Sequence, residues 1–233
     1  MEASGRRLRS NRGIGNAVIA LLAAQVLALL FGAVAVLLEM SLLQRIIDGS
    51  QVTLAEATAS DNRVAASARL WLALLAATVI LWLIWQHRAQ ANLKATAVSG
   101  LEYSPGWAVG WWLIPFANLW KPFQVNRELW EASGGDYDWR SLPTWPVLGW
   151  WWASWILAGV LGRIAAAARS GAETASELRS ADIVDLLSTA EVVVSAVLAI
   201  LLVRSVIERQ DRLPQVVPQT PPPQQPPRPD VSA

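Results

Sequence analysis

The sequence contains no cysteine and only one histidine among its 233 residues. Without cysteine the chain can form neither a disulfide nor a thiolate metal site, and one histidine cannot build a typical zinc site. Charged residues are scarce at 16%, whereas soluble domains carry about a quarter. The net charge of +1 gives no field that would favour nucleic acid as a partner. No serine-hydrolase, zinc-protease or nucleotide-binding signature is present. We therefore predict a protein that is not an enzyme and has no cofactor.

The chain has long apolar runs with few or no charges, and 54% of its residues are hydrophobic. They predict four transmembrane helices, at residues 16–38, 65–86, 141–162 and 186–207. Each has close to the ~20 residues that cross a bilayer. The first run is too long for the apolar region of a secretory signal peptide, so we read it as an uncleaved span.

The segments between these runs carry the charges. We expect a basic N-terminus at 1–15, a polar loop at 39–64, a longer region at 87–140 and a connector at 163–185. Within the longer region, residues 121–132 predict an amphipathic helix, because Phe123 and Trp130 share a face and Pro122 suits a first helical turn. Residues 210–233 form a Pro-rich tail that we expect to be disordered.

The stretch Tyr103–Trp120 is uncharged but rich in tryptophan, proline and glycine. It is either a fifth span or an interfacial or re-entrant element. Pro115 removes a backbone donor, and Asn118 would have to be satisfied inside lipid, so both disfavour a span. The side chain of an asparagine hydrogen-bonds nearby backbone and stabilises turns, so we expect the Asn118 side chain to form a turn here; the alternative is that it contacts a ligand. We therefore expect an element at 103–120 that lies in the membrane surface.

The distribution of lysine and arginine supports this choice. With four spans, one side carries four cations at the N-terminus, five between the second and third spans and four after the fourth. The other side carries three in each connector, giving thirteen against six. A fifth span would remove the bias. The positive-inside rule then places both termini in the cytoplasm.

The blocks "WLIWQHRAQANL", "SPGWAVGWWLIPFANLWKPFQVNRELWEAS" and "WWWASWIL" resemble a bacterial multi-spanning membrane family, domain of unknown function 4328, from about residue 70 to 209. The resemblance implies a bacterial plasma-membrane protein. It implies no particular activity, because none is assigned to the family. It places the family's characteristic positions on a set of seven residues: Arg88, Asn92, Trp111, Trp112, Pro115, Asn118 and Pro122. Arg88 and Asn92 are four apart, so on a helix they share a face that either binds a headgroup or serves structure.

Two polar residues lie within or beside the predicted spans. Gln25 would prefer a neighbouring helix to lipid. Glu191 is either an intramembrane acid or, if its span begins at Val192, a residue at the outer interface.

The sequence thus predicts an all-α integral membrane protein with four transmembrane helices and a Trp/Pro-rich interfacial element. Its expected partners are the lipid bilayer and a membrane or cytoplasmic protein, and the sequence is compatible with a homo-oligomer. We expect a non-enzymatic component in a bacterial plasma membrane. The alternative is a small transporter or channel that uses Gln25 and Glu191.

Overall fold

The computed structural model describes residues 10–96, 98–136 and 138–213. Every regular element in these residues is a helix. In chain order they are α1 (Arg12–Ile47), α2 (Leu54–Ala95), α3 (Pro105–Gly110), η1 (Ala117–Leu119), α4 (Lys121–Ala132), η2 (Trp139–Ser141), α5 (Pro146–Ser170) and α6 (Ala175–Arg212).

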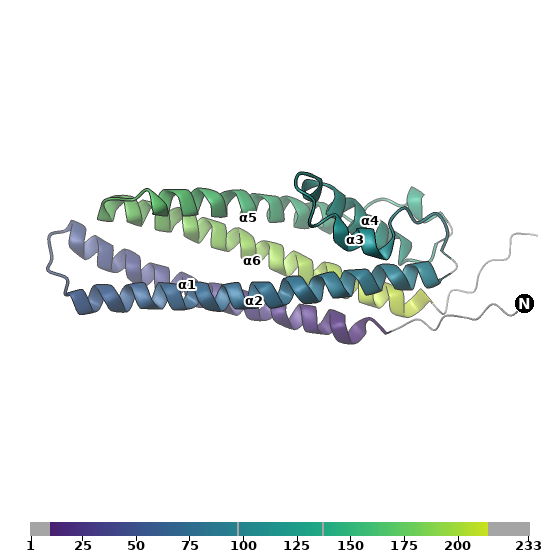
Figure 1. Ribbon diagram of the computed structural model, residues 1–233, viewed down its shortest axis with the longest axis horizontal. Coiled ribbons are helices and arrows are strands. Elements are labelled where there is room, and N and C mark those ends of the chain that lie inside the picture. Colours follow the sequence, from purple (N-terminus) through teal and green to yellow (C-terminus); the bar gives the residue numbers. More distant parts are fainter. Residues whose placement is uncertain (1–9, 97, 137, 214–233) are drawn as a thin grey trace, which may run out of the picture.

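The four long helices run side by side in an elongated bundle (Figure 1). α6 packs against both α1 and α5, and α1 also packs against α2. The short connections 48–53 and 171–174 lie at one end of the bundle. The start of α1, the short helices α3 and α4 and the end of α6 lie together at the opposite end. The two ends of the bundle are therefore built very differently.

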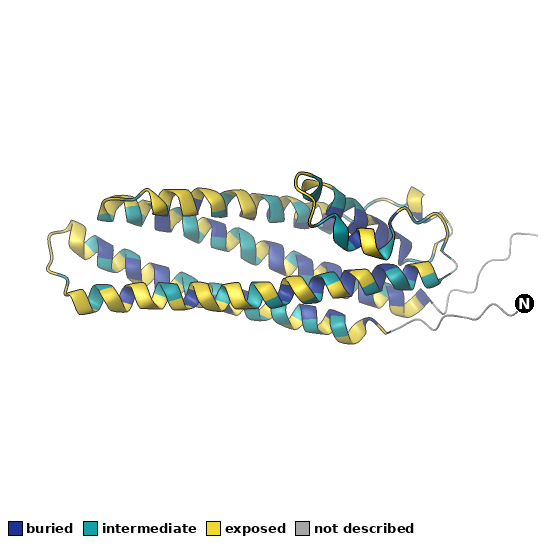
Figure 2. Ribbon diagram, viewed as in Figure 1, coloured by how far each residue is buried: buried dark blue, intermediate teal, exposed yellow. Residues whose placement is uncertain are grey.

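The four long helices are each long and apolar enough to cross a membrane. Large apolar side chains cover their outer faces, including Leu27 (69% exposed), Ile80 (59%) and Trp150 (70%), and exposed residues follow the helices along the bundle (Figure 2). Soluble proteins rarely expose apolar surface so continuously, whereas lipid accepts it. The predicted all-α membrane fold with four spanning helices is confirmed.

The stretch Tyr103–Trp120 forms no fifth span. Its only regular elements are α3, with six residues, and η1, with three. Six helical residues cover about 9 Å, and a helix needs about 30 Å to cross the hydrocarbon core. The chain instead turns back at the end of the bundle, where α4 covers the same residues, 121–132, as the predicted amphipathic helix.

The helices extend well beyond the expected spans. α2 begins at Leu54, within the segment expected to be a polar loop at 39–64, and α5 and α6 take up most of the connector at 163–185, which was expected to be helical. Both helix starts carry a capping box, formed by Thr53 with Glu56 and by Thr174 with Glu177. In a capping box, side chains satisfy backbone donors in the first turn, so a polar segment can begin a helix.

The chain termini also differ from expectation where they are described. α1 begins at Arg12, inside the basic segment predicted at 1–15. α6 continues to Arg212, into the first residues of the segment predicted as a tail at 210–233. The remainder of that tail, from residue 214 onward, lies outside the described residues, as do residues 1–9.

The packing changes along the bundle. At the end that carries α3 and α4, the buried residues are large, such as Trp85, Leu129 and Leu202. Toward the short connections the helices pack through small residues such as Ala35 and Ser67. Small residues let membrane helices approach closely without a large apolar core. The bulk of the hydrophobic core therefore lies at the α3–α4 end.

A glycine permits the closest approach in that core. A Cβ atom on Gly15 would clash with the Ile207 side chain and lie 3.2 Å from Trp85 Nε1. Gly15 thus allows α1, α2 and α6 to meet at the start of α1.

Candidate interfacial site at the tryptophan-rich end

Residues 98–145, here called the insert, connect α2 to α5 and fold onto the end of the bundle where α1 begins (Figure 1). Every tryptophan of the chain except Trp71 falls within residues 82–155, in the insert or in the helix segments that adjoin it. Tryptophan prefers the level of the lipid headgroups. The insert and its surroundings are therefore the first candidate for a functional surface.

A group of aromatic rings that pack mainly edge to face, here called the tryptophan cluster, fixes the insert to α2 and α5. Its centre is Trp112, whose ring centroid lies 6.3 Å from that of Trp82 on α2 and 5.7 Å from that of Trp155 on α5. The Trp112 indole Nε1 donates to Gln86 Oε1 at 2.7 Å. Trp152 Nε1 donates to the carbonyl oxygen of Leu119 at 3.0 Å. The cluster comprises Trp82, Trp112, Trp151, Trp152, Trp155 and Phe123.

A buried carboxylate, Glu128 on α4, holds the first part of the insert. Its Oε1 accepts from Gln90 Nε2 at 2.6 Å and from the Tyr103 backbone N–H at 3.2 Å. Its Oε2 accepts from the Glu102 backbone N–H at 2.5 Å. Gln90 Nε2 also donates to the Tyr103 carbonyl at 3.0 Å. We call this arrangement the Glu128 clamp, because it joins α2, α4 and the irregular segment before α3.

The Glu128 clamp contains no cation. Burial raises the pKa of Glu128, and the backbone hydrogen bonds from Glu102 and Tyr103 oppose the rise without cancelling it. The nearby Glu102 carboxylate adds to the increase. Burial likewise raises the pKa of the Tyr103 phenol to about 12, and its hydroxyl donates to Gln124 Oε1 at 3.0 Å. Glu128 is therefore a buried acid whose charge is stabilised by N–H donors alone.

Contacts with α6 hold the other side of α4. Trp130 Nε1 donates to Ser205 Oγ at 2.8 Å, and the Trp130 ring stacks on Trp145 with centroids 5.4 Å apart. The guanidinium carbon of Arg209 lies 3.9 Å from the Trp130 ring centroid, within cation–π range. α4 is thus fixed between α2 and α6.

The turn between α3 and α4 is strained. Phe116 has φ 63° and ψ −51°, and it is the one non-glycine residue with positive φ among those described. The Ala117 N–H donates to the Pro115 carbonyl at 2.8 Å across it, which makes Phe116 the centre of a γ-turn of the rare kind. Such strain persists only where the surroundings impose it, and it often marks a functional segment.

Backbone bonds close this turn, which corrects the role predicted for Asn118. The Asn118 N–H donates to the Ile114 carbonyl at 3.0 Å. No bond from the Asn118 side chain to a described residue holds the turn. The prediction of a turn at this position is right, whereas the prediction that the side-chain amide forms it is wrong. Pro115 is exposed and contributes its carbonyl to the γ-turn.

The outer surface of the turn is apolar. Leu113 is 74% exposed and Phe116 77%, and Leu119 and Trp120 are about half exposed. No charged residue occurs between Tyr103 and Trp120. These residues, 113–120, are here called the apolar turn.

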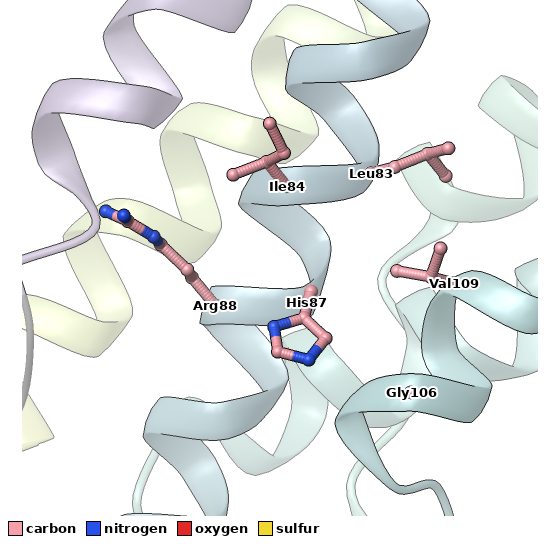
Figure 3. A pocket seen from close by; sticks show the side chains of 6 residues that line it. All are labelled: Leu83, Ile84, His87, Arg88, Gly106 and Val109. Atoms are coloured by element: carbon pink, nitrogen blue, oxygen red, sulfur yellow. The ribbon is translucent and has the colours of Figure 1, made fainter.

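A shallow groove of about 380 Å³ lies between α2 and α3. It is lined by Leu83, Ile84, His87, Arg88, Gly106 and Val109. Figure 3 shows Gly106 and Val109 on the α3 side, Ile84 and Arg88 on the opposite side, and the His87 ring between them. The lining thus includes two basic side chains and no acidic one.

The seven residues that the family resemblance singled out lie in different parts of the tryptophan-rich end. Arg88 lines the groove, and Asn92 lies one turn further along α2, half-buried. The Trp111 ring packs against the Trp107 ring at a tilt, with centroids 4.8 Å apart, and the Lys121 amine lies 5.4 Å from the Trp111 ring centroid. Pro122 is buried in the first turn of α4, where its carbonyl accepts from Asn126 Nδ2 at 2.8 Å. The seven residues therefore do not form one pocket.

Gln25 and Glu191, the two polar residues of the predicted spans, lie in different places. Gln25 is buried, and its Nε2 donates to the hydroxyl of Thr78 on α2. The expectation that it prefers a helix neighbour is confirmed. Glu191 is half-exposed on α6 and makes no hydrogen bond or ion pair with any residue that the structure describes. The two residues lie on different helices and do not share a contact.

Sequence reasoning missed an ion cluster near the short connections. Arg169 on α5 lies 2.8 Å from Glu39 Oε1 on α1 and 2.6 Å from Asp182 Oδ1 on α6. Both carboxylates are buried, with 4% and 0% of their side chains exposed. We call these three residues the Arg169 triad. Nothing in the local sequence distinguishes Arg169 from its neighbour Arg163, because the triad forms only when three distant segments meet.

Among the described residues, no group of three or more His, Cys, Asp and Glu side chains gathers closely enough to hold a metal ion. Comparison with known proteins gives one match, to the family model described as Domain of unknown function (DUF4328), over residues 48–208. No curated protein matches the chain. No solved structure matches it.

Proposed function

The chain belongs to the family described as Domain of unknown function (DUF4328), and from this membership and the site geometry we propose that it is a non-enzymatic component of the bacterial plasma membrane. In this proposal both termini and the insert are cytoplasmic. The insert engages the lipids of the cytoplasmic leaflet, and the apolar turn enters the headgroup region.

The observation that carries the proposal is the exposed apolar turn at the tryptophan-rich end. Leu113 and Phe116 are each about three-quarters exposed on a turn whose backbone is strained. In water, no favourable contact would offset the cost of a strained loop that exposes an aromatic ring. At the membrane surface the same side chains leave water for the acyl boundary, and each fully buried side chain of this kind gains about 1.5–3 kcal/mol.

The one-sided distribution of tryptophan supports the same position. Transmembrane proteins commonly carry aromatic belts at both interfaces. In this chain only Trp71 lies away from the insert end. The indoles of Trp112, Trp130 and Trp152 donate to polar acceptors in the chain while their rings pack among apolar groups. This amphipathic use of the ring is what the headgroup region favours.

No specific observation favours the transporter alternative over this proposal. Gln25 is engaged with Thr78 and serves the packing of α1 on α2. A protein partner for the insert is an alternative to lipid, and the following experiment distinguishes the two.

Membrane insertion of the apolar turn can be measured with a single environment-sensitive dye, because the chain has no cysteine of its own. We expect an NBD dye on Leu113→Cys, reconstituted in liposomes without other proteins, to be quenched by nitroxide-labelled lipids. A dye on Asp136→Cys, an exposed polar position in the insert, provides the control and should be quenched much less. Equal, weak quenching at both positions would contradict the proposal and favour a protein partner for the turn.

Phe116→Gly provides a matched variant for this measurement. Glycine tolerates positive φ, so the unfolding free energy should change by no more than about 1 kcal/mol. The dye on Leu113→Cys should nevertheless lose much of its quenching, because the aromatic anchor is gone. If quenching is unchanged, Phe116 does not anchor the turn.

A further inference from the structure

We propose that the groove between α2 and α3 binds one phospholipid with an anionic headgroup. Its phosphate contacts His87 and the Arg88 guanidinium, which lies toward α1 in Figure 3 and turns to the groove when the lipid binds, and its upper acyl chain lies against Leu83, Ile84 and Val109. The inference rests on the proposed function, because it requires the insert to lie at the membrane surface. It adds the class of ligand and the place where that ligand binds.

The order of residues along α2 matches the order of groups in a phospholipid. The apolar residues Leu83 and Ile84 precede the basic residues His87 and Arg88 by one helical turn, a rise of about 6 Å. The hydrophobic run of α2 comes before these basic residues in the chain. The Leu83 end of the groove therefore faces the membrane core, and the His87 end faces the aqueous side.

The charge of the groove favours an anion. Arg88 forms no ion pair with any residue that the structure describes. The lining contains no carboxylate. By contrast, Arg12 and Arg209 at the same end have partners, in Asp211 and in the Trp130 ring. A guanidinium without a counter-ion at headgroup depth suits a phosphate, to which it can donate two parallel hydrogen bonds.

The groove also has space for such a ligand. A Cβ atom on Gly106 would meet no heavy atom within 4 Å. The groove volume of about 380 Å³ falls in the range of small-molecule sites. Trp107, which is 52% exposed, follows Gly106 on α3 and offers a further apolar surface beside the groove.

The single histidine provides a direct reporter for this site. We suggest preparing the full chain without a histidine tag, with isotopically labelled histidine, in phosphatidylcholine nanodiscs. Phosphatidylglycerol is then introduced at increasing mole fraction at constant pH, and the imidazole chemical shifts are followed by NMR. We expect a saturable shift with phosphatidylglycerol. Phosphatidylcholine alone and soluble glycerol phosphate should each leave the shift small and unsaturated.

Three variants test the assignment. Gly106→Leu fills the open space of the groove and should abolish the saturable shift. Gly149→Leu, which makes the same change at an equally open glycine on α5, is the matched control and should behave as the wild type. Arg88→Gln should weaken apparent affinity about fivefold, the factor expected for one basic residue near an anionic surface. Arg88→Lys should recover most of that loss.

Other outcomes would overturn the inference. An equal response to both lipids, or a full response in Gly106→Leu, would mean that the groove is not the site. An equal response to glycerol phosphate would mean that no acyl chain is bound. The dye measurement on the apolar turn is independent of these variants. Quenching there without a saturable His87 shift would reject the lipid site alone and retain the proposed function.

Discussion

Three buried polar side chains determine how the insert attaches to the bundle. Gln86 and Gln90 are four residues apart on α2, so they lie on one face, and both are fully buried. Gln86 accepts from Trp112, and Gln90 donates to Glu128. A buried amide or carboxylate is costly when it is unpaired. These bonds therefore favour one docking position for the insert over others with equal apolar contact.

The Glu128 clamp should make stability depend on pH. Its folded-state pKa is raised above the ordinary value of 4.5, so the folded state holds its proton more tightly than the unfolded state does. This contribution favours folding below pH 4.5 and is lost as pH rises through the raised value. We expect Glu128→Gln, which does not titrate, to show a flatter dependence of thermal unfolding on pH in detergent between pH 4 and 8.

Glu128→Leu separates the hydrogen bonds from the charge. Leucine leaves the N–H groups of Glu102 and Tyr103 without their acceptor, which should cost about 1–3 kcal/mol at every pH. For the pH prediction, the contrary outcome is a wild type whose thermal stability does not change between pH 4 and 8. It would show that hydrogen bonds offset the burial of the Glu128 carboxylate completely.

At the scale of elements, composition predicts the apolar part of each helix but not its ends. Residues 121–132 combine a proline in the first turn with aromatic residues seven apart, and α4 covers these residues. The polar segments before α2 and α6 contain "TLAE" and "TASE", and each forms a capping box. That signal is local and readable, yet before α2 the polar composition around it favours a loop. A capping motif should therefore outweigh composition at a helix start.

The Arg169 triad joins α1, α5 and α6 near the short connections, and we expect it to be the most sensitive polar contact of the bundle. Arg169→Met leaves two buried carboxylates without a cation. Breaking a fully buried ion pair costs about 3–5 kcal/mol, and because the Arg169 side chain is 39% exposed, water screening places the cost here below that range. The variant should show a large drop in thermal stability after purification in detergent.

Two comparisons make this prediction specific. Arg163→Met is the control, since Arg163 is exposed and donates to the Gly159 carbonyl on its own helix at 3.4 Å, and it should change stability little. Adding Glu39→Gln and Asp182→Asn to Arg169→Met should recover part of the loss, because no unpaired charge remains. No difference between the two arginine variants would show that the triad does not stabilise the bundle.

At the scale of the whole molecule, the sequence predicts what contacts lipid better than what contacts protein. Apolar runs and tryptophan content follow from the bilayer, so four spans and an element at 103–120 that does not span could be predicted. The Glu128 clamp joins residues 38 positions apart, and the Arg169 triad joins residues 130 apart. Periodicity along one helix does not specify which distant helix it faces. The groove is likewise invisible in sequence, because it exists only when α3 folds back beside α2.

The orientation of the molecule is the last prediction, and the arrangement of its ends makes it testable. The start of α1, the insert and the end of α6 lie together (Figure 1), so one side of the membrane should hold all three. The cation bias of thirteen to six places that side in the cytoplasm.

In intact cells, cysteines at the exposed positions Ser10 and Asp136 should resist an impermeant thiol reagent, whereas cysteines at Ser50 and Glu173 in the short connections should react. All four should react after the cells are permeabilised, which provides the control. Labelling of Ser10 and Asp136 alone would reverse the orientation, and labelling of only one of those two would contradict the shared end itself.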